Sequence, residues 1–247
     1  MPRLQRGAYS RVEGQAVRVE LIAETSTNHG GSVALAREFI WRFAEAGADW
    51  IKFQTTRVRH LRPDDPQYAW FQRAELSDDA HHELKEECTK AGVKFLTTVY
   101  HPDDVPFVAS LGLEAIKIGS GEATDFTLRT AVYHAGFTRV FVGCGLGTVW
   151  SQHHADLLRC VTRYPAPAAL ASYAYGREYK GWSDHCVGLD GCQIAICRGA
   201  SIIEKHVCLP NQARDLKPYE ATAYEFKQLR AFADEDPSRF LGRWQHA

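Results

Sequence analysis

Two histidines end two consecutive apolar segments of the chain. The segment Gly181-Trp182-Ser183-Asp184-His185 is followed, after one short helical stretch, by Ile202-Ile203-Glu204-Lys205-His206. In a barrel of parallel strands, side chains at the carboxyl ends of adjacent strands converge on one mouth, so the two imidazoles could share one metal ion. Each histidine could equally be an ordinary capping or rim residue. The metal site is favoured because Ser183, Asp184, Glu204 and Lys205 bring donors, acceptors and charge to the same mouth.

Two lysines lie inside otherwise apolar strands, Lys52 within 50–53 and Lys117 within 115–118. Lysine is rarely buried without a partner, so both ammonium groups must meet anions or carboxylates at the barrel axis. Ammonium groups with hydroxyls and glycine-exposed amides could form a phosphate pocket. The alternative is a pair of structural salt bridges with Glu24 and Glu122. These carboxylates could also be acid–base groups or accept hydrogen bonds from substrate hydroxyls.

Alternating strands and helices must position these side chains. Apolar periodicity and turn signals predict eight strands and about seven helices, which is typical of a (β/α)8 TIM barrel of the α/β class. One domain is expected over 1–247, with an N-terminal extension at 1–16. The predicted strands are 17–25, 50–54, 94–100, 114–118, 138–143, 155–162, a segment running into 183, and 201–206. Six of the helices are predicted to follow Ser32, Ser77, His101, Asp125, Gly188 and Ala221.

Two connections depart from this regular pattern. Residues 55–76 are polar and contain prolines, which predicts a long loop at the mouth, and such loops usually cover sites. Its aromatic residues Tyr68, Trp70 and Phe71 could cover the mouth or a neighbouring subunit. Residues 146–154 are too few for a barrel helix and its two loops, so we expect the helix after the fifth strand to be missing or shortened.

Composition excludes several classes of function. With 247 residues, 45% of them apolar, the chain can bury one large core, and its net charge of −1 gives no field for nucleic acid or an anionic membrane. There is no apolar run of roughly 20 residues for a membrane span, and residues 1–14 lack the core of a signal peptide. Seven cysteines without a Cys-x-x-Cys pair indicate reduced, mostly buried thiols. We therefore expect a cytoplasmic enzyme without nucleic acid or membrane partners.

Six motifs, in this order, resemble the N-acetylneuraminate (sialic acid) synthase family, in its barrel domain only and without its C-terminal antifreeze-like domain. They are Ile22-Ala23-Glu24 with Asn28-His29-Gly30, Gly47-Ala48-Asp49 running into Lys52-Phe53-Gln54, Lys117 to Glu122, Tyr164-Pro165, Ser183-Asp184-His185, and Glu204-Lys205-His206. The resemblance implies a transferase that condenses phosphoenolpyruvate with the aldehyde of a sugar, N-acetylmannosamine or a relative. The products would be phosphate and a 2-keto-3-deoxy sugar acid.

The resemblance also implies roles for individual residues. His185 and His206 match the ligands of a divalent ion, Mn²⁺ or Mg²⁺, that binds the aldehyde oxygen. Glu24 and Gln54 match residues near the sugar and the reacting carbons, and Glu122 and Tyr164 match further wall positions. The residues that match the phosphoenolpyruvate site are Lys52, Thr98, Lys117, Ser120 and Ser183, and Thr162 stands at one further position of that site.

Several positions depart from the family pattern. Thr162 replaces a common Asn of the phosphate pocket, 142–145 replaces the usual turn after the fifth strand, and Arg214-Asp215-Leu216 only partly replaces the loop after the eighth. Because the acceptor half of the site is remodelled, the aldehyde could be N-acetylmannosamine-like or a different aldose. Two alternatives stay open, namely a pyruvate-using aldolase or lyase and a non-catalytic ligand-binding relative.

Two further expectations concern surfaces. A barrel that lacks one helix exposes apolar strand surface, so we expect a homodimer. The adjacent pairs His81-His82 and His153-His154 are expected to face solvent, because neighbouring residues of a helix point in different directions.

Overall fold

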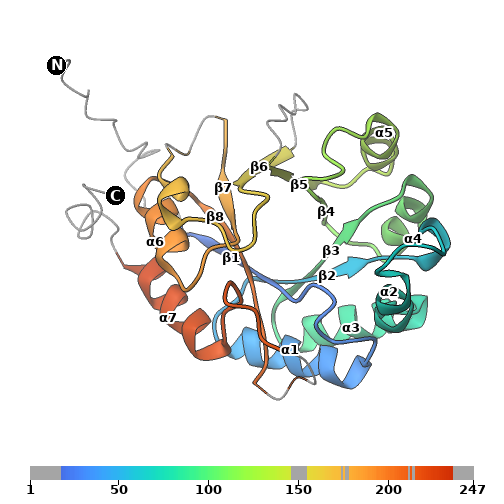
Figure 1. The fold of residues 1–247 in the computed structure, drawn as a ribbon, viewed down its shortest axis with the longest axis horizontal. Helices are drawn as coiled ribbons and strands as arrows, with labels where there is room; N and C mark the ends of the chain where they lie inside the picture. The colour runs from blue at the N-terminus through green and yellow to red at the C-terminus, as the bar shows by residue number, and fades with distance from the viewer. Residues whose placement is uncertain are drawn as a thin grey trace.

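Eight parallel strands close into a barrel in chain order (Figure 1). The computed structural model describes residues 18–145 and 155–235, except 174, 176, 177, 211, 213 and 214. β1 pairs with both β2 and β8, which closes the ring. This confirms the predicted TIM barrel. The strands are β1 (Glu20–Glu24), β2 (Trp50–Thr55), β3 (Lys94–Val99), β4 (Ala115–Ile118), β5 (Arg139–Cys144), β6 (Ala155–Cys160), β7 (Gly181–Asp184) and β8 (Ile202–His206).

Helices surround the barrel and begin where the sequence supplies capping residues. The predicted caps Ser77 and Asp125 each accept a hydrogen bond from a backbone N–H of the first turn, as do Ser32 and Thr222. The described helices are α1 (Val33–Glu45), α2 (Tyr68–Ala74), α3 (Asp78–Lys90), α4 (Val105–Ser110), α5 (Phe126–His134), α6 (Asp190–Cys197) and α7 (Ala223–Asp234), with 3₁₀ turns η1 (Val58–His60), η2 (Pro102–Asp104) and η3 (Ala168–Ala171).

Of the two unusual connections predicted from the sequence, 55–76 and 146–154, the structure describes only the first. The stretch 55–76, predicted as a loop, contains η1 and α2. α2 lies against the loop after β1, where the indole N–H of Trp70 donates to Thr27 Oγ1 at 3.2 Å. The prediction of a missing helix falls on 146–154, which lie outside the described residues, as do His153 and His154.

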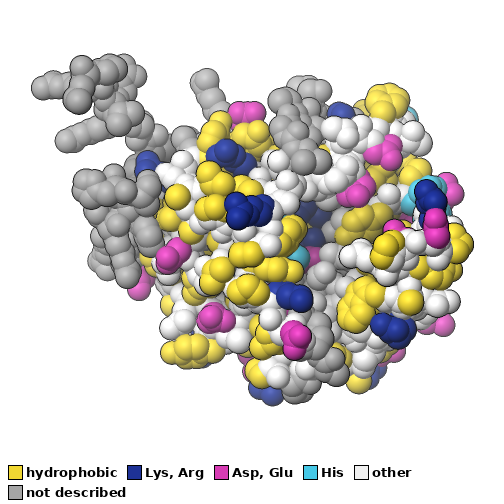
Figure 2. Space-filling view, viewed as in Figure 1, with side chains coloured by type: hydrophobic (Ala, Val, Ile, Leu, Met, Phe, Trp, Pro, Cys, Tyr) yellow, Lys and Arg dark blue, Asp and Glu magenta, His cyan; other side chains and the backbone are white. Residues whose placement is uncertain are grey.

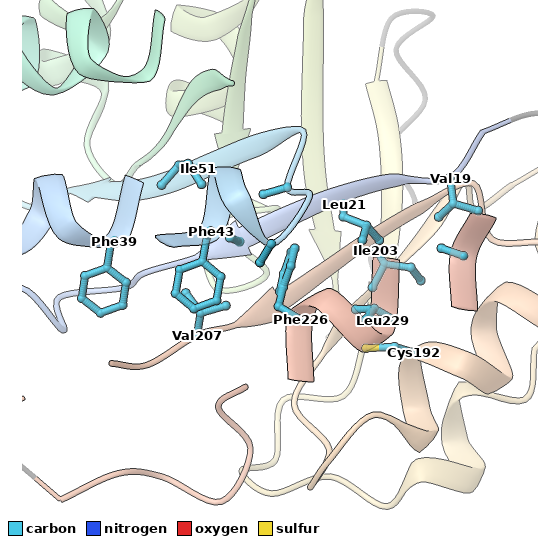
Figure 3. Close-up of a cluster of buried hydrophobic side chains, with 14 of the residues drawn as sticks. Val19, Leu21, Phe39, Phe43, Ile51, Cys192, Ile203, Val207, Phe226 and Leu229 are labelled. Carbon is cyan, nitrogen blue, oxygen red and sulfur yellow. The ribbon is translucent and has the colours of Figure 1, made fainter. Parts of the chain in front are cut away.

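The core has two layers separated by the sheet. Strand side chains alternate, so Leu21, Ile51 and Ile203 point outward against Phe43 of α1 and Phe226 of α7 (Figure 3). The rings of Phe43 and Phe226 meet edge to face at 5.4 Å. The alternate residues fill the barrel interior, namely Ile22, Trp50, Leu96, Ala115, Phe141, Leu158 and Ile202.

One predicted surface residue belongs to the core. His81 was expected to face solvent, which is wrong, because its side chain is fully buried while His82 is exposed. His81 falls on the α3 face that also carries Leu84 and Cys88. Its imidazole is satisfied by Thr55 Oγ1 at 3.0 Å and Ser77 O at 2.8 Å. Burial lowers the pKa of His81 to about 4.

All seven cysteines are free thiols and buried, as the sequence predicts. Among the described residues, no helix has the length and apolar character needed to cross a membrane.

Candidate active site

A cavity of about 100 Å³ opens at the carboxyl ends of the strands. Figure 2 looks onto this hollow, where basic (dark blue), histidine (cyan) and acidic (magenta) side chains are visible. Ten of the twelve predicted site residues line it: Glu24, Lys52, Gln54, Thr98, Lys117, Ser120, Tyr164, Ser183, His185 and His206. Residues from six sequence motifs, together with Thr98 of β3, are therefore neighbours in space.

Strand register explains this convergence. Glu24 pairs across the sheet with Lys52 on one side and with His206 on the other. Thr98 pairs with Gln54 of β2 and with Lys117 of β4. Because side chains alternate along each strand, the last inward position of every strand contributes to the same layer above the apolar interior.

Four buried charges occupy the floor of the cavity. Lys117 Nζ donates to both oxygens of Glu204, at 2.8 and 2.7 Å, and Ser183 Oγ donates to Glu204 Oε1 at 2.6 Å. Lys52 Nζ lies 2.7 Å from Glu24 Oε2 and 3.4 Å from Glu204 Oε2, and it donates to Thr98 Oγ1 at 3.0 Å. Of the two carboxylates named in the salt-bridge alternative, Glu24 does pair with Lys52. Glu122 does not take part, because Lys117 pairs with Glu204.

The pKa shifts follow from burial and these pairings. Burial works against ionised Glu204, but the charges of Lys117 and Lys52 outweigh it and lower the pKa of the carboxyl group. Burial works against charged Lys52 too, yet Glu204 and Glu24 raise its pKa. The pKa of Glu24 is raised by burial and by the nearby Glu204 charge. Glu24 is therefore the carboxyl group of the cluster that takes up a proton most readily.

The two predicted metal ligands are neutral imidazoles. His185 Nδ1 lies 2.6 Å from Val161 O, so Nδ1 must be the donor, and the lone pair of Nε2 then accepts from the Tyr164 hydroxyl at 2.9 Å. The ring centroids of His185 and His206 are 5.4 Å apart. Burial lowers the pKa of both imidazoles.

This donor set fits a divalent metal ion. A carbonyl that holds Nδ1–H and leaves Nε2 as the ligand atom is the usual arrangement for a metal-binding histidine. Two neutral imidazoles leave coordination positions for substrate and water, with the Tyr164 hydroxyl giving up its place on Nε2.

A second group of potential ligands lies on the loops after β2 and β3, formed by His60, His101 and Asp103. The rings of His60 and His101 are stacked at 3.7 Å with an interplanar angle of 10°. The lone pairs of parallel rings lie in parallel planes and do not meet at one point. In addition, Arg59 pairs with Asp104 beside His60. His185 and His206 therefore fit a metal ion better than this cluster.

The remaining predicted residues lie elsewhere. Thr162 is exposed and Glu122 is half-buried, and neither lines the cavity. Burial raises the pKa of Glu122. Asp184 and Lys205 were expected at the mouth, which is wrong, because they face outward and pair with each other at 2.5 Å. Arg214 lies outside the described residues.

Several cavity residues have no assigned role in the sequence prediction. Tyr100, Cys160 and Gly143 line the cavity two positions beyond the inward residues Thr98, Leu158 and Phe141. The two-residue period of a strand could have identified them. Tyr219 lies in the loop after β8, so no strand period could have identified it. Its ring centroid lies 5.1 Å from that of Tyr164 and 5.5 Å from that of His206.

Comparison with known proteins agrees with this geometry. The sequence profile of the NeuB family matches residues 39–236. The chain is 28% identical to the N,N'-diacetyllegionaminic acid synthase of Campylobacter jejuni over 242 residues, covering 81% of this chain and 72% of that protein. It is 26% identical to the pseudaminic acid synthase of Helicobacter pylori over 264 residues, covering 88% and 76%.

A solved structure shows the same architecture. The N-acetylneuraminic acid (sialic acid) synthetase of Leptospira borgpetersenii superposes with a TM-score of 0.78 at 25% identity, covering 93% of this chain and 86% of that one. A truncated 3-deoxy-D-arabino-heptulosonate 7-phosphate synthase of Thermotoga maritima has a TM-score of 0.65 at 16% identity, which shows a shared fold.

Proposed function

Because the chain belongs to the NeuB family, whose synthases condense phosphoenolpyruvate, we propose that it joins phosphoenolpyruvate to the open-chain aldehyde of a sugar. The products are a 2-keto-3-deoxy sugar acid and phosphate. The observation that supports this best is one cavity holding two buried lysines beside two neutral histidines. The lysines suit a phosphorylated carboxylic acid, and the histidines suit a metal ion that receives an aldehyde.

Lys52 and Lys117 bind the anionic groups of phosphoenolpyruvate in this proposal, with Thr98, Ser120 and Ser183 as hydroxyl donors. The cavity holds these groups in reach of one another. Their ammonium groups already have carboxylate partners, so phosphoenolpyruvate must compete with Glu204 for Lys117 and with Glu24 for Lys52. Before the substrate binds, these carboxylates compensate the buried charges of Lys52 and Lys117.

His185 and His206 hold the divalent ion, Mn²⁺ or Mg²⁺, in this proposal. When bound, such an ion acts as a Lewis acid on the aldehyde oxygen. Val161 O keeps His185 in the tautomer that offers Nε2. Tyr164 and Tyr219 form an aromatic wall beside both histidines, against which the sugar carbons can pack.

Carbon–carbon bond formation uses the electrons of the enol double bond. C3 of phosphoenolpyruvate attacks the aldehyde carbon, and the aldehyde oxygen becomes a hydroxyl after taking a proton. Water then adds to the electron-poor C2, and phosphate leaves from C2 to give the ketone. Glu24 is suited to donate the proton to the aldehyde oxygen, because the pKa of its carboxyl group is raised. Gln54 Nε2 fixes the position of this carboxyl group by donating to Oε1 at 2.8 Å.

The acceptor in this proposal is an aldose, either N-acetylmannosamine-like or a different aldehyde sugar. The test is phosphate release from phosphoenolpyruvate with Mn²⁺ across a panel that includes N-acetylmannosamine and arabinose. Release that needs both the metal and an aldehyde is expected, and His206→Ala should lower it at least about 100-fold while phosphoenolpyruvate binding persists. His101→Ala, which changes the stacked histidine pair, is the matched control and should keep full activity.

Two outcomes would contradict the proposal. Consumption of pyruvate without phosphate release would favour an aldolase or lyase on the same barrel. Absence of both phosphate release and phosphoenolpyruvate binding would favour a non-catalytic relative.

A further inference from the structure

We propose that the buried Asp184–Lys205 ion pair, on the outer side of the barrel, positions His185 and His206 as a metal-binding pair. This inference rests on the proposed function and adds two positioning residues to it. Lys205 Nζ donates to Asp184 Oδ2 at 2.5 Å, and both side chains are completely inaccessible to solvent. Each residue of the pair directly precedes one of the two histidines.

The backbone ladder between β7 and β8 ends before His185, whose carbonyl oxygen instead accepts from the backbone N–H of Ala166 in the loop after β6 at 2.8 Å. The register between β7 and β8 runs from Gly181 with Ile202 to Asp184 with Lys205, and β7 ends there. His185 therefore lies beyond the last paired position, whereas His206 still belongs to β8 and pairs with Glu24. At this level the loop after β6 holds His185, and its link to β8 comes from side chains.

Lys205 supplies that link on both sides of His185. Its ammonium group donates to the side chain of Asp184 and also to the carbonyl oxygen of Cys186 at 2.7 Å. Asp184 Oδ2 in turn accepts from the backbone N–H of Cys186 at 3.2 Å. One residue of β8 thus holds the residues before and after His185, which restricts how far that imidazole can move from His206.

Neighbouring groups fix the pair from the other directions. The indole N–H of Trp182 donates to Asp184 Oδ1 at 2.7 Å. α6 packs directly on this carboxylate, since a Cβ placed on Gly191 would come within 2.3 Å of Asp184 Oδ1. A larger residue at position 191 would force the helix or the carboxylate to shift, so α6 leaves the carboxylate little room.

Stability does not explain an ion pair at this position. The outward residues one layer deeper, Trp182 and Ile203, are apolar and pack in the core between the sheet and the helices. An apolar pair in place of Asp184 and Lys205 would be about as stable or more stable, because desolvating two charges costs several kcal/mol. Charged hydrogen bonds differ from apolar contacts in being directional, and direction is what a two-ligand metal site needs.

The test replaces the pair with apolar residues of similar size, as Asp184→Leu with Lys205→Met. We expect a folded protein by circular dichroism, with phosphoenolpyruvate affinity within about threefold of wild type because Lys52 and Lys117 are untouched. Mn²⁺ affinity, measured by electron paramagnetic resonance of the free ion, is expected to fall at least about tenfold. The visible spectrum of bound Co²⁺ is expected to change as well, which a purely structural role would not require.

A matched control removes a different ion pair of the barrel. Arg139 pairs with Glu20 and Asp156 at the opposite end of the strands. Arg139→Met should leave Mn²⁺ affinity within about twofold of wild type, even if the protein melts earlier. If the double variant does not fold, Asp184→Asn keeps the size of the side chain and should weaken Mn²⁺ binding about threefold or more.

The outcomes separate this inference from the proposed function. Wild-type Mn²⁺ affinity in the folded double variant, or in Asp184→Asn, would overturn the positioning role alone. Mn²⁺ uptake that His206→Ala leaves unchanged would overturn the metal site itself, and the positioning role with it.

Discussion

Replacing Glu204 with glutamine tests whether charge holds the cavity together. The carboxylate accepts two hydrogen bonds from Lys117 and one from Ser183, and Lys52 lies 3.4 Å away. Glutamine keeps the size but removes the negative charge, so two buried ammonium groups are left with one carboxylate, Glu24. Breaking a buried ion pair costs about 3–5 kcal/mol.

The expected loss is large enough to measure by thermal unfolding. For a chain of 247 residues, about 1 kcal/mol shifts Tm by about 2–4 °C, so about 3 kcal/mol corresponds to about 6–12 °C. The loss should shrink as the pH rises, because burial and the charge of Lys52 already lower the pKa of Lys117. Its ammonium group can then release a proton in the folded variant.

Phosphoenolpyruvate should restore part of this stability. A ligand at 100 times its Kd stabilises a protein by about 2.7 kcal/mol. Its stabilisation should be greater for Glu204→Gln than for wild type, since the anion replaces the missing charge. Glu114→Gln is the matched control, because Glu114 pairs with Lys94 on the surface at 2.6 Å and such pairs contribute about 1 kcal/mol or less. A Glu204→Gln protein that melts within about 2 °C of wild type would refute the reasoning.

Two further perturbations act on histidines. The pKa of His81 is lowered to about 4 from about 6.5 in the unfolded chain, so its stabilising effect is complete above pH 6.5 and is lost as the pH falls toward 4. Between pH 7 and pH 5 the wild-type protein should lose about 2 kcal/mol of unfolding free energy from this histidine. His81→Gln should not show that loss when the free energy of unfolding is measured with urea at both pH values. Wild-type and variant stabilities that fall in parallel with pH would contradict the prediction. Tyr164→Phe removes the hydroxyl that donates to His185 Nε2 and should tighten Mn²⁺ binding about 2–10-fold by calorimetry, the equivalent of one neutral hydrogen bond. Weaker Mn²⁺ binding by Tyr164→Phe would contradict this and would mean that the hydroxyl stabilises the metal-bound site.

The sequence predicted the barrel well because its signals are local. Each strand carries its own apolar run, and capping residues such as Ser77 and Asp125 mark where helices begin. Because the strands are parallel and their side chains alternate between inside and outside, the last inward residue of each strand lies at the same mouth of the barrel. Lys52, Lys117 and His206 could be assigned to the cavity on this basis alone.

What could not be predicted are choices between partners that the closed barrel brings together. Lys117 pairs with Glu204 across the mouth and not with Glu122, which is close in sequence but lies outside the cavity. His81 looked like a solvent-facing residue because its hydrogen-bond partner on the second strand, Thr55, is distant in sequence. Such pairings depend on barrel diameter and helix placement, which no local pattern contains.

The sequence also did not separate the two faces of β7 and β8. Ser183 and Glu204 form a hydrogen-bonded pair on the inner face, and Asp184 and Lys205 form an ion pair on the outer face, one residue later in each strand. A one-residue slip of β8 against β7 would break both pairs at once and leave buried charges on each face. The register of these two strands is therefore specified by charge as well as by packing. The same register sets which residue of each strand ends at the mouth, so the arrangement that binds phosphoenolpyruvate in our proposal also determines where His206 stands.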